Sequence, residues 1–319
     1  MPVLGLGTWK MPKASCADLV RAAVETGWRH LDCACDYGNE AEVGKGMRDA
    51  LQAGVCARED LWVTSKLWNT YHRREHVRAA CERSMSDLGV DYLDLYLVHF
   101  PISLKFVPFE TRYPPEWVHD PEAADEADRV MVYDRVPIAE TWGAMEELVD
   151  AGLVKNIGVC NFNVSLLTDL LANARVPPAV LQIESHPFLT QDYLIEFAQK
   201  QGVHVTAFSP LGAASYVEMG WTKAEEGVLH ARPVTEAAAA HGVTPGQVLL
   251  RWGVQRGTSC IPKTTRRERL RENVAAAATG AFELTEAEMK AISALDKNLR
   301  YNDPAEFCKG MGGPCPIYN

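Results

Sequence analysis

Short apolar segments alternate with longer amphipathic ones along the whole chain, and this alternation is the feature that most limits its fold. Segment 74–88 is typical of the amphipathic kind, because its apolar residues recur at helical spacing. Those residues are Val77, Cys81, Met85 and Leu88. Eight apolar segments have the length of β-strands, and helix-like sequence follows each of them. They are residues 3–7, 29–32, 61–66, 93–98, 155–159, 180–184, 203–207 and 259–261.

Eight strand-and-helix units predict a parallel α/β sheet that closes into a (β/α)8, or TIM, barrel. Parallel neighbours need a crossover between them, and a closed barrel leaves no unpaired sheet edge. The 319 residues suit one barrel domain over 1–319. An open doubly wound sheet is the alternative. It is expected to carry a G-x-G-x-x-G turn after its first strand, and residues 5–10 lack the third glycine.

Three segments fall outside the repeat: 101–136, 210–232 and the tail 295–319. Structureless stretches this long in a compact barrel are usually lids or binding loops. The first is also rich in aromatic residues, which argues against a purely solvated insertion. We therefore expect all three segments to shape a pocket at the C-terminal face of the barrel.

The composition limits the class of protein. With 47% apolar and 23% charged residues it is ordinary for a soluble globular chain, and its net charge of −10 disfavours a nucleic-acid surface. No stretch approaches the ~18 consecutive apolar residues of a membrane span. The chain opens without the basic and apolar regions of a signal peptide. We therefore expect a cytoplasmic enzyme with neither nucleic-acid nor membrane partners.

Nine cysteines are scattered through the sequence, and no two of them show a C-x-x-C spacing. A metal site or a disulfide framework would be expected to show paired, regularly spaced cysteines. We therefore expect reduced, mostly buried thiols and no metal.

Four polar residues stand at or just beyond the ends of three successive predicted strands. They are Asp32, Tyr37, Lys66 and His99. Catalytic groups of a parallel barrel gather at this end of the strands, so an acid, a phenol, an ammonium and an imidazole are expected to share one site. A lone lysine or aspartate at a strand end is more often part of a structural ion pair, and it is the joint position of the four residues that favours catalysis.

The expected chemistry of this group is proton donation. A phenol has an ordinary pKa near ~10, and a neighbouring cation such as Lys66 is expected to lower it. Asp32 would keep Lys66 charged and oriented, and His99 would orient a substrate oxygen or relay a proton. Such a site suits the protonation of the alkoxide that develops when a hydride adds to a carbonyl. A Schiff-base lyase with Lys66 as nucleophile is a different class that the same residues allow.

The sequence resembles the aldo-keto reductase family over essentially its whole length. The resemblance rests on GLGTW at 5–9, DCACDYGNE at 32–40, KLWN at 66–69 and LVH at 97–99. It implies a (β/α)8 barrel that uses NADPH, with Tyr37 as general acid and Asp32, Lys66 and His99 as its supporting network. Members of the family occur as monomers and as homodimers, and both stay open for this chain.

The resemblance also implies a set of cofactor contacts. The segment GVCNF at 158–162 resembles the one that holds the nicotinamide carboxamide, although Cys160 stands where a serine is usual. Phe208 stands where a tyrosine usually stacks on the nicotinamide, and a ring face suffices for stacking. Thr265 replaces an asparagine of many relatives, so NADH stays open beside NADPH. The implied cofactor residues are Thr8, Trp9, Asn161, Gln182, Phe208, Ser209, Leu211, Lys263, Thr264, Arg269 and Asn273. The remaining arginines of this region, Arg266, Arg267 and Arg271, are expected on solvated helix surface.

Within the family, the chain is most similar to D-xylose (aldose) reductases. This resemblance rests on HFPI at 99–102, KFVP at 105–108, YPP at 113–115, PIAETW at 137–142 and LRYNDP at 299–304. It implies reduction of an aldose such as D-xylose to its alditol, with Trp9, Asp36, His99 and Asn302 lining the sugar pocket. Aldose-6-phosphate reductases of the mannose-6-phosphate type and broad aldehyde reductases are the alternatives. A non-catalytic subunit that only binds the cofactor is a further one.

Overall fold

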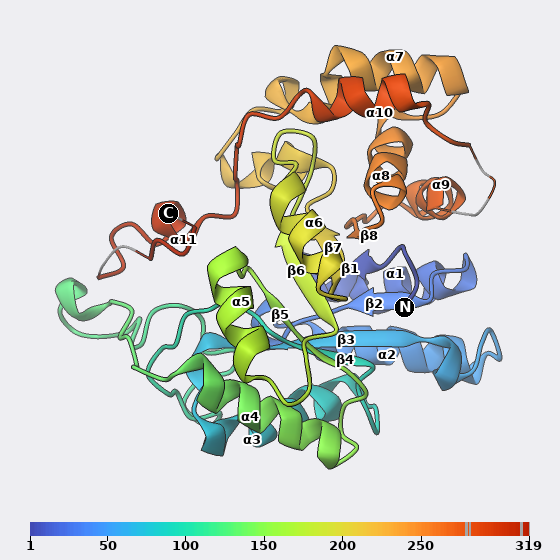
Figure 1. Cartoon of the computed structure of the whole chain (residues 1–319). Coiled ribbons are helices and arrows are strands. Elements are labelled where there is room, and N and C mark those ends of the chain that lie inside the picture. The colour runs from blue at the N-terminus through green and yellow to red at the C-terminus, as the bar shows by residue number, and fades with distance from the viewer. Residues whose placement is uncertain (278–279, 281, 313–314, 319) are drawn as a thin grey trace.

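Eight parallel strands form the centre of the computed structural model, and helices between consecutive strands cover the outside (Figure 1). The structure describes residues 1–277, 280, 282–312 and 315–318. Each strand pairs in parallel with the next along the chain, in the order β1 to β8. This confirms the predicted (β/α)8 barrel. The strands are β1 Leu6–Gly7, β2 His30–Asp32, β3 Trp62–Leu67, β4 Leu95–Val98, β5 Ile157–Cys160, β6 Val180–Glu184, β7 His204–Phe208 and β8 Ser259–Ile261.

The last strand closes against the chain just before the first. Leu4 and Cys260 form a parallel bridge. The Gly5 amide donates to the Cys260 carbonyl at 2.9 Å, and the Cys260 amide donates to the Val3 carbonyl at 2.9 Å. The open doubly wound sheet is therefore wrong, because such a sheet would leave these groups at an unpaired edge.

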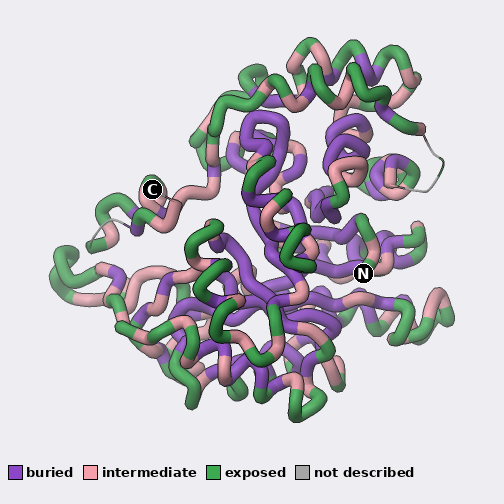
Figure 2. The backbone as a smooth tube through the Cα atoms, viewed as in Figure 1, coloured by how far each residue is buried: buried purple, intermediate pink, exposed green. Residues whose placement is uncertain are grey.

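The core follows the barrel, where buried residues run along the strands while exposed ones gather on the outer helices (Figure 2). The four residues of β4 and the five of β6 are all buried. Strands buried on both faces are typical of parallel sheets covered by helices. Packing is tight at Gly158 on β5, where a Cβ atom would lie 2.3 Å from the Val180 carbonyl oxygen. Only glycine fits there, because strands β5 and β6 approach so closely.

Two helices were not predicted: the short α11, and α10, which begins after the capping box formed by Thr285 and Glu288. That signal is present in the sequence and could have revealed α10. The other helices lie where the periodicity predicts them, with ends that differ by at most two residues. The helices are α1 Lys13–Glu25, α2 Glu40–Gln52, α3 Arg74–Leu88, α4 Ile138–Asp150, α5 Val164–Asn173, α6 Asp192–Lys200, α7 Arg232–His241, α8 Pro245–Gln255, α9 Arg267–Ala277, α10 Glu286–Ser293 and the short α11 Pro304–Phe307.

In their described residues, the three segments outside the repeat carry short helical turns and, within 101–136, an isolated antiparallel bridge between Leu104 and Tyr133. Segment 101–136 contains the 3-10 turn Glu126–Asp128, and 210–232 contains four such turns. The tail 295–319 contains α11, and its residues 313, 314 and 319 lie outside the described residues. All nine cysteines carry free thiols. None of the helices in the described ranges has both the length and the hydropathy that a membrane crossing requires.

Candidate active site

The structure brings Asp32, Tyr37, Lys66 and His99 together at the C-terminal end of the barrel. Asp32 ends β2, Lys66 is the penultimate residue of β3, and His99 directly follows β4. Tyr37 ends the 3-10 turn that follows β2. Neighbouring parallel strands thus deliver all four side chains to one place.

Lys66 is the centre of this cluster, because its ammonium has a partner for each of its three hydrogens. Nζ lies 2.5 Å from Asp32 Oδ1, 2.8 Å from the Cys33 carbonyl oxygen and 3.1 Å from the Tyr37 hydroxyl oxygen. An ammonium donates hydrogen bonds and accepts none, so the Tyr37 oxygen is the acceptor. The hydroxyl proton of Tyr37 therefore points away from Lys66, and Tyr37 lines the adjoining cavity.

Burial and neighbouring charges have opposing effects on the pKa values of Lys66 and Tyr37. Burial acts to lower the pKa of Lys66, but the charge of Asp32 and its hydrogen bond outweigh it, so the pKa is raised and the ammonium stays charged. Burial raises the pKa of Tyr37 by more than the Lys66 charge lowers it. Lys66 thus lowers the pKa of Tyr37, as expected. The expected net fall of that pKa is nevertheless wrong, because burial destabilises the phenolate by more than Lys66 stabilises it. At neutral pH the phenol is protonated and able to donate.

His99 contributes a neutral ring. Burial lowers the pKa of His99 well below its ordinary value, and the charges of Lys66 and His72 lower it further. Its imidazole meets the Tyr37 ring edge-on, with ring centroids 5.9 Å apart. A neutral imidazole carries one donor and one acceptor, so it suits the orientation of a substrate oxygen rather than the supply of a second positive charge.

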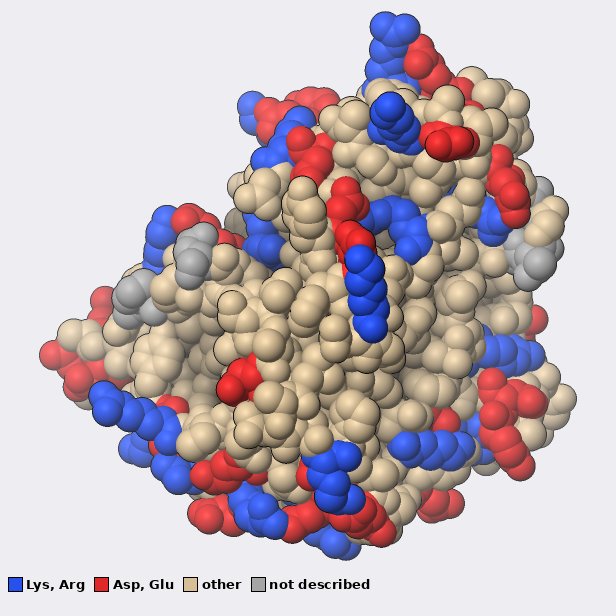
Figure 3. Space-filling model, viewed as in Figure 1, with Lys and Arg blue, Asp and Glu red and all other residues tan. Residues whose placement is uncertain are grey.

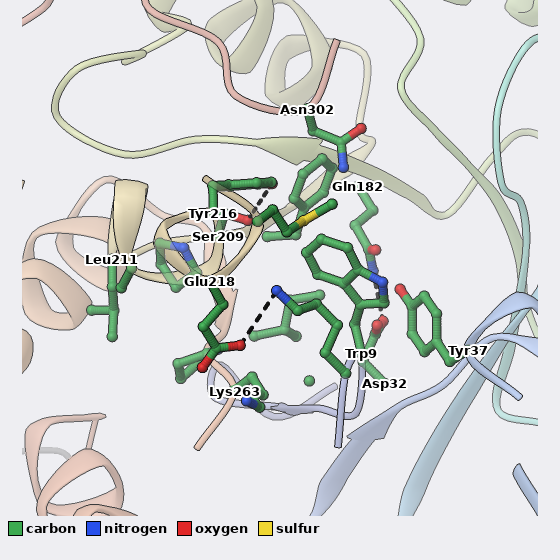
Figure 4. A pocket seen from close by; sticks show the side chains of 18 of the residues that line it. Trp9, Asp32, Tyr37, Gln182, Ser209, Leu211, Tyr216, Glu218, Lys263 and Asn302 are labelled. Carbon is green, nitrogen blue, oxygen red and sulfur yellow. Dashed lines mark hydrogen bonds and ion pairs between the residues drawn. The ribbon is translucent and has the colours of Figure 1, made fainter. Parts of the chain in front are cut away.

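A cavity of about 550 Å³ opens beside Tyr37, lined by strand ends and by all three segments outside the repeat (Figure 4). Lys66 lies behind Tyr37, and Thr8 and Asn273 are also buried outside the cavity lining. The Thr8 hydroxyl donates to the Asp32 carbonyl at 2.9 Å. Most of the expected site residues line the cavity: Trp9, Asp32, Asp36, Tyr37, His99, Asn161, Gln182, Phe208, Ser209, Leu211, Lys263, Thr264, Arg269 and Asn302.

One side of the cavity offers amide groups next to the catalytic cluster. Gln182, on β6, donates from Nε2 to Asp32 Oδ2 at 2.7 Å. Asn161 follows β5 in a left-handed backbone conformation, and its Nδ2 donates to the His99 carbonyl at 2.8 Å. Tyr318 of the tail donates to Asn161 Oδ1 at 2.7 Å. Both amides are therefore fixed in orientation, as the recognition of a planar carboxamide requires.

The other end of the cavity carries positive charge. Lys263, Arg266 and Arg269 line it beside Thr264, at the passage from β8 into α9. Figure 3 shows lysine and arginine side chains in and beside a hollow on this face. Arg266 is exposed, as expected, and it also lines the cavity. Amides at one end and cations at the other fit a ligand with a carboxamide ring and a phosphate, as a nicotinamide dinucleotide has.

Two residues that the sequence did not single out join across the cavity. Lys10 Nζ lies 3.5 Å from Glu218 Oε2, and Glu218 belongs to the 3-10 turn Val217–Met219 (Figure 4). The two residues come from opposite halves of the chain. No local pattern could have revealed their pairing, because it depends on the path of segment 210–232.

The remaining wall of the cavity is aromatic. Trp221 stacks on Phe307 with centroids 5.7 Å apart, and Phe307 meets Trp117 edge-on at 5.3 Å. Trp221 belongs to segment 210–232, Phe307 to the tail and Trp117 to segment 101–136. These ring contacts therefore join all three segments. Asp36 and Asn302 are polar residues of the same cavity lining. Segment 101–136 was expected at the pocket for its aromatic content, whereas the contributions of Trp221 and Phe307 were not foreseen.

Among the described residues, no group of three or more His, Cys, Asp or Glu side chains is placed to hold a metal ion. The site is thus organised around a phenol, an ammonium and a buried carboxylate. A protonated phenol beside a cavity with an amide end and a cationic end is the arrangement that a nicotinamide-dependent carbonyl reductase requires.

Comparison with known proteins agrees with this chemistry. The family model for the aldo/keto reductase family matches residues 3–297. The chain is 50% identical to the probable NAD(P)H-dependent D-xylose reductase of Arthroderma otae, over 96% of this chain and 91% of the relative. It is 46% identical to the NADPH-dependent aldose reductase of Saccharomyces cerevisiae, over 97% and 94% of the two chains. The solved structure of the aldose reductase from Schistosoma japonicum superposes with a TM-score of 0.80 at 39% identity, over 94% of this chain and 90% of that one.

The chain therefore belongs to the aldo/keto reductase family. Its similarity to a D-xylose reductase and an aldose reductase extends along nearly the full length of each relative.

Proposed function

We propose that this chain is an NADPH-dependent reductase, with NADH as a second cofactor, that reduces an aldose such as D-xylose to its alditol. The observation that carries the proposal is the Lys66 ammonium, whose three partners leave the Tyr37 proton free for the cavity. The similarity to D-xylose reductases supports the substrate class. The proposal includes a single domain over 1–319, a cytoplasmic location, and a monomer or homodimer without nucleic-acid or membrane partners.

In the proposed mechanism, Tyr37 is the general acid. When bound, the nicotinamide supplies the hydride for the carbonyl carbon of the sugar. The Tyr37 hydroxyl donates its proton to the carbonyl oxygen, and Lys66 stabilises the phenolate that remains. Asp32 keeps Lys66 charged and in position. The neutral His99 ring orients the carbonyl oxygen toward Tyr37.

The cofactor is held at both ends of the cavity in this proposal. Asn161 and Gln182 would hold the carboxamide, and Phe208 would offer its ring face for stacking on the nicotinamide. Arg269 and the Lys263–Thr264 segment bind the 2′-phosphate. The remaining assigned contacts come from Thr8, Trp9, Ser209, Leu211 and Asn273. Arg266, which also lines the cavity, adds positive charge at the phosphate end.

The sugar occupies the side of the cavity between the catalytic group and the aromatic wall. Trp9, Asp36 and Asn302, which line the cavity, are its proposed contacts. Sugar hydroxyls need polar partners, because an apolar pocket discriminates weakly for a hydroxyl group.

The test is consumption of reduced nicotinamide, followed by absorbance, with D-xylose, mannose 6-phosphate and propanal and with each cofactor in turn. We expect D-xylose to be reduced, and faster with NADPH. Faster turnover of mannose 6-phosphate would identify a sugar-phosphate reductase instead. Turnover of propanal alone would identify a general aldehyde reductase, and no oxidation with any aldehyde would contradict the reductase.

The pH dependence of sugar binding tests the role of Asp36. Burial and the charge of Glu116 raise the pKa of Asp36 to about 7, against the effect of Lys66. Above that pH the carboxylate accepts stronger, charge-assisted hydrogen bonds from sugar hydroxyls, and below it the group is neutral. We therefore expect kcat/KM for D-xylose to rise with pH through about 7. Asp36→Asn should remove this rise, and propanal should not show it in the wild type. The same rise with propanal would contradict the assignment.

A further inference from the structure

Glu184 is a buried carboxylate that the proposed mechanism leaves without a role. It ends β6, its side chain is fully buried, and it is absent from the cavity lining. A carboxylate is costly to bury, so its place requires donors that satisfy it. The hydrogen-bond donors around Glu184 indicate its role.

Two of the donors are consecutive backbone amides of the C-terminal tail. The Tyr301 amide donates to Glu184 Oε1 at 2.9 Å, and the Asn302 amide donates to Glu184 Oε2 at 2.8 Å. The third partner is His186, whose Nε2 lies 2.9 Å from Oε1. Both oxygens of the Glu184 carboxylate thus hold the tail at Asn302, whose side chain lines the cavity.

The rings around this anchor reinforce it. Tyr301 packs between two others, with its ring centroid 5.4 Å from that of His186 and 5.2 Å from that of Tyr216. The Leu299 amide also donates to the Phe188 carbonyl at 2.9 Å. These contacts fix the path of the tail up to Asn302. Glu184 is the side chain that fixes the Asn302 backbone itself.

We propose that Glu184 is a positioning residue for sugar specificity, which holds Asn302 at the cavity through the backbone amides of Tyr301 and Asn302. The inference rests on the proposed function for its substrate, because Asn302 is assigned to a sugar hydroxyl. Glu184 itself touches neither substrate nor cofactor. Its loss therefore affects a hydroxylated substrate and spares a plain aldehyde.

The test is Glu184→Gln, which keeps the shape of the side chain but replaces one acceptor oxygen with a donor. At least one of the three donors then faces an NH2 group, and we expect the tail to shift. We expect KM for D-xylose to rise about tenfold, which is the effect of one lost substrate hydrogen bond. The kcat/KM for propanal and the Kd for NADPH should stay within about twofold, because neither depends on Asn302. Glu184→Asp, which withdraws the same charge by one methylene, is the second variant and should act in the same direction.

Glu146→Gln is the matched control. Glu146 is also a buried carboxylate, and its Oε1 accepts from the Arg175 and Val176 amides at 2.7 and 2.8 Å. It lies on α4, outside the cavity lining. The same chemical change there should leave KM for D-xylose unchanged.

A double-mutant cycle separates positioning from general damage. If Glu184 acts through Asn302, adding Glu184→Gln to Asn302→Ala should change KM for D-xylose by less than about twofold. Independent, additive effects would overturn the inference. A parallel loss of propanal turnover, or an unchanged KM for D-xylose in both Glu184 variants, would also overturn it.

Hydrogen exchange at residues 301 and 302 tests the anchor without any turnover. We expect faster exchange of these amides in Glu184→Gln and not in Glu146→Gln. Unchanged exchange would overturn the inference. If the wild type fails to reduce D-xylose, the proposed function fails, and the exchange result still decides whether Glu184 holds the tail.

Discussion

Replacing Tyr37 by phenylalanine is expected to lower kcat for D-xylose by at least about a thousandfold, within the range that general acid catalysis supplies. The substitution removes only the hydroxyl that accepts from Lys66 and donates to the substrate. The Lys66–Asp32 pair at 2.5 Å and the Gln182–Asp32 contact at 2.7 Å do not depend on it. The Kd for NADPH, measured by fluorescence titration, should therefore stay within about twofold.

Tyr193→Phe is the control for this experiment, because Tyr193 lies on α6 and is 89% exposed. It should change neither kcat nor the Kd for NADPH. Residual turnover of Tyr37→Phe within about tenfold of the wild type would exclude Tyr37 as the acid. Loss of NADPH binding would show that Tyr37 supports the cofactor instead.

Lys66→Met is expected to have the second largest effect, and to act on stability as well as on rate. The phenolate loses its stabilising charge, so kcat should fall about a hundredfold or more. Asp32, 1% exposed, is left as a buried charge without its cation, and breaking such a pair typically costs ~3–5 kcal/mol of unfolding free energy. Denaturant unfolding and steady-state kinetics on one preparation measure both.

The double variant Asp32→Asn with Lys66→Met separates the two effects. Removing both charges should restore most of the stability, because an uncharged buried pair has no ionic desolvation cost. It should not restore kcat. Recovery of turnover in the double variant would mean that Lys66 serves only the fold.

The surroundings of Lys66 argue against the Schiff-base lyase. Its ammonium is engaged by three acceptors and its pKa is raised, whereas a Schiff-base nucleophile must be a free amine. Borohydride treatment of the wild type with D-xylose should therefore leave Lys66 unmodified. A reduced adduct at Lys66 would support the lyase.

The fold could be predicted because each of its units is local. Apolar segments and helical periodicity occur within about fifteen residues, and the parallel order follows from their alternation. The meeting of Asp32, Lys66 and His99 follows from the same logic, since neighbouring parallel strands end at one face. Helix α10 was not predicted, although the capping box that Thr285 and Glu288 form can be recognised in the sequence.

The rest of the site depends on the path of irregular chain, which no local pattern encodes. The Tyr318 contact with Asn161 and the Glu184 contacts with residues 301–302 join elements far apart in sequence. The pKa of Tyr37 could not be predicted for a related reason. Sequence shows that a cation is near, but only the structure shows that burial outweighs it.

The most direct test of the central claim is the fate of a labelled hydride. D-xylose is incubated with the wild-type protein and NADPH that carries deuterium at the transferable position of the nicotinamide, and the product is examined by mass spectrometry and NMR. We predict xylitol with one deuterium, located at C1. Unlabelled xylitol, or unchanged D-xylose after prolonged incubation with a protein shown to bind NADPH, would contradict the account.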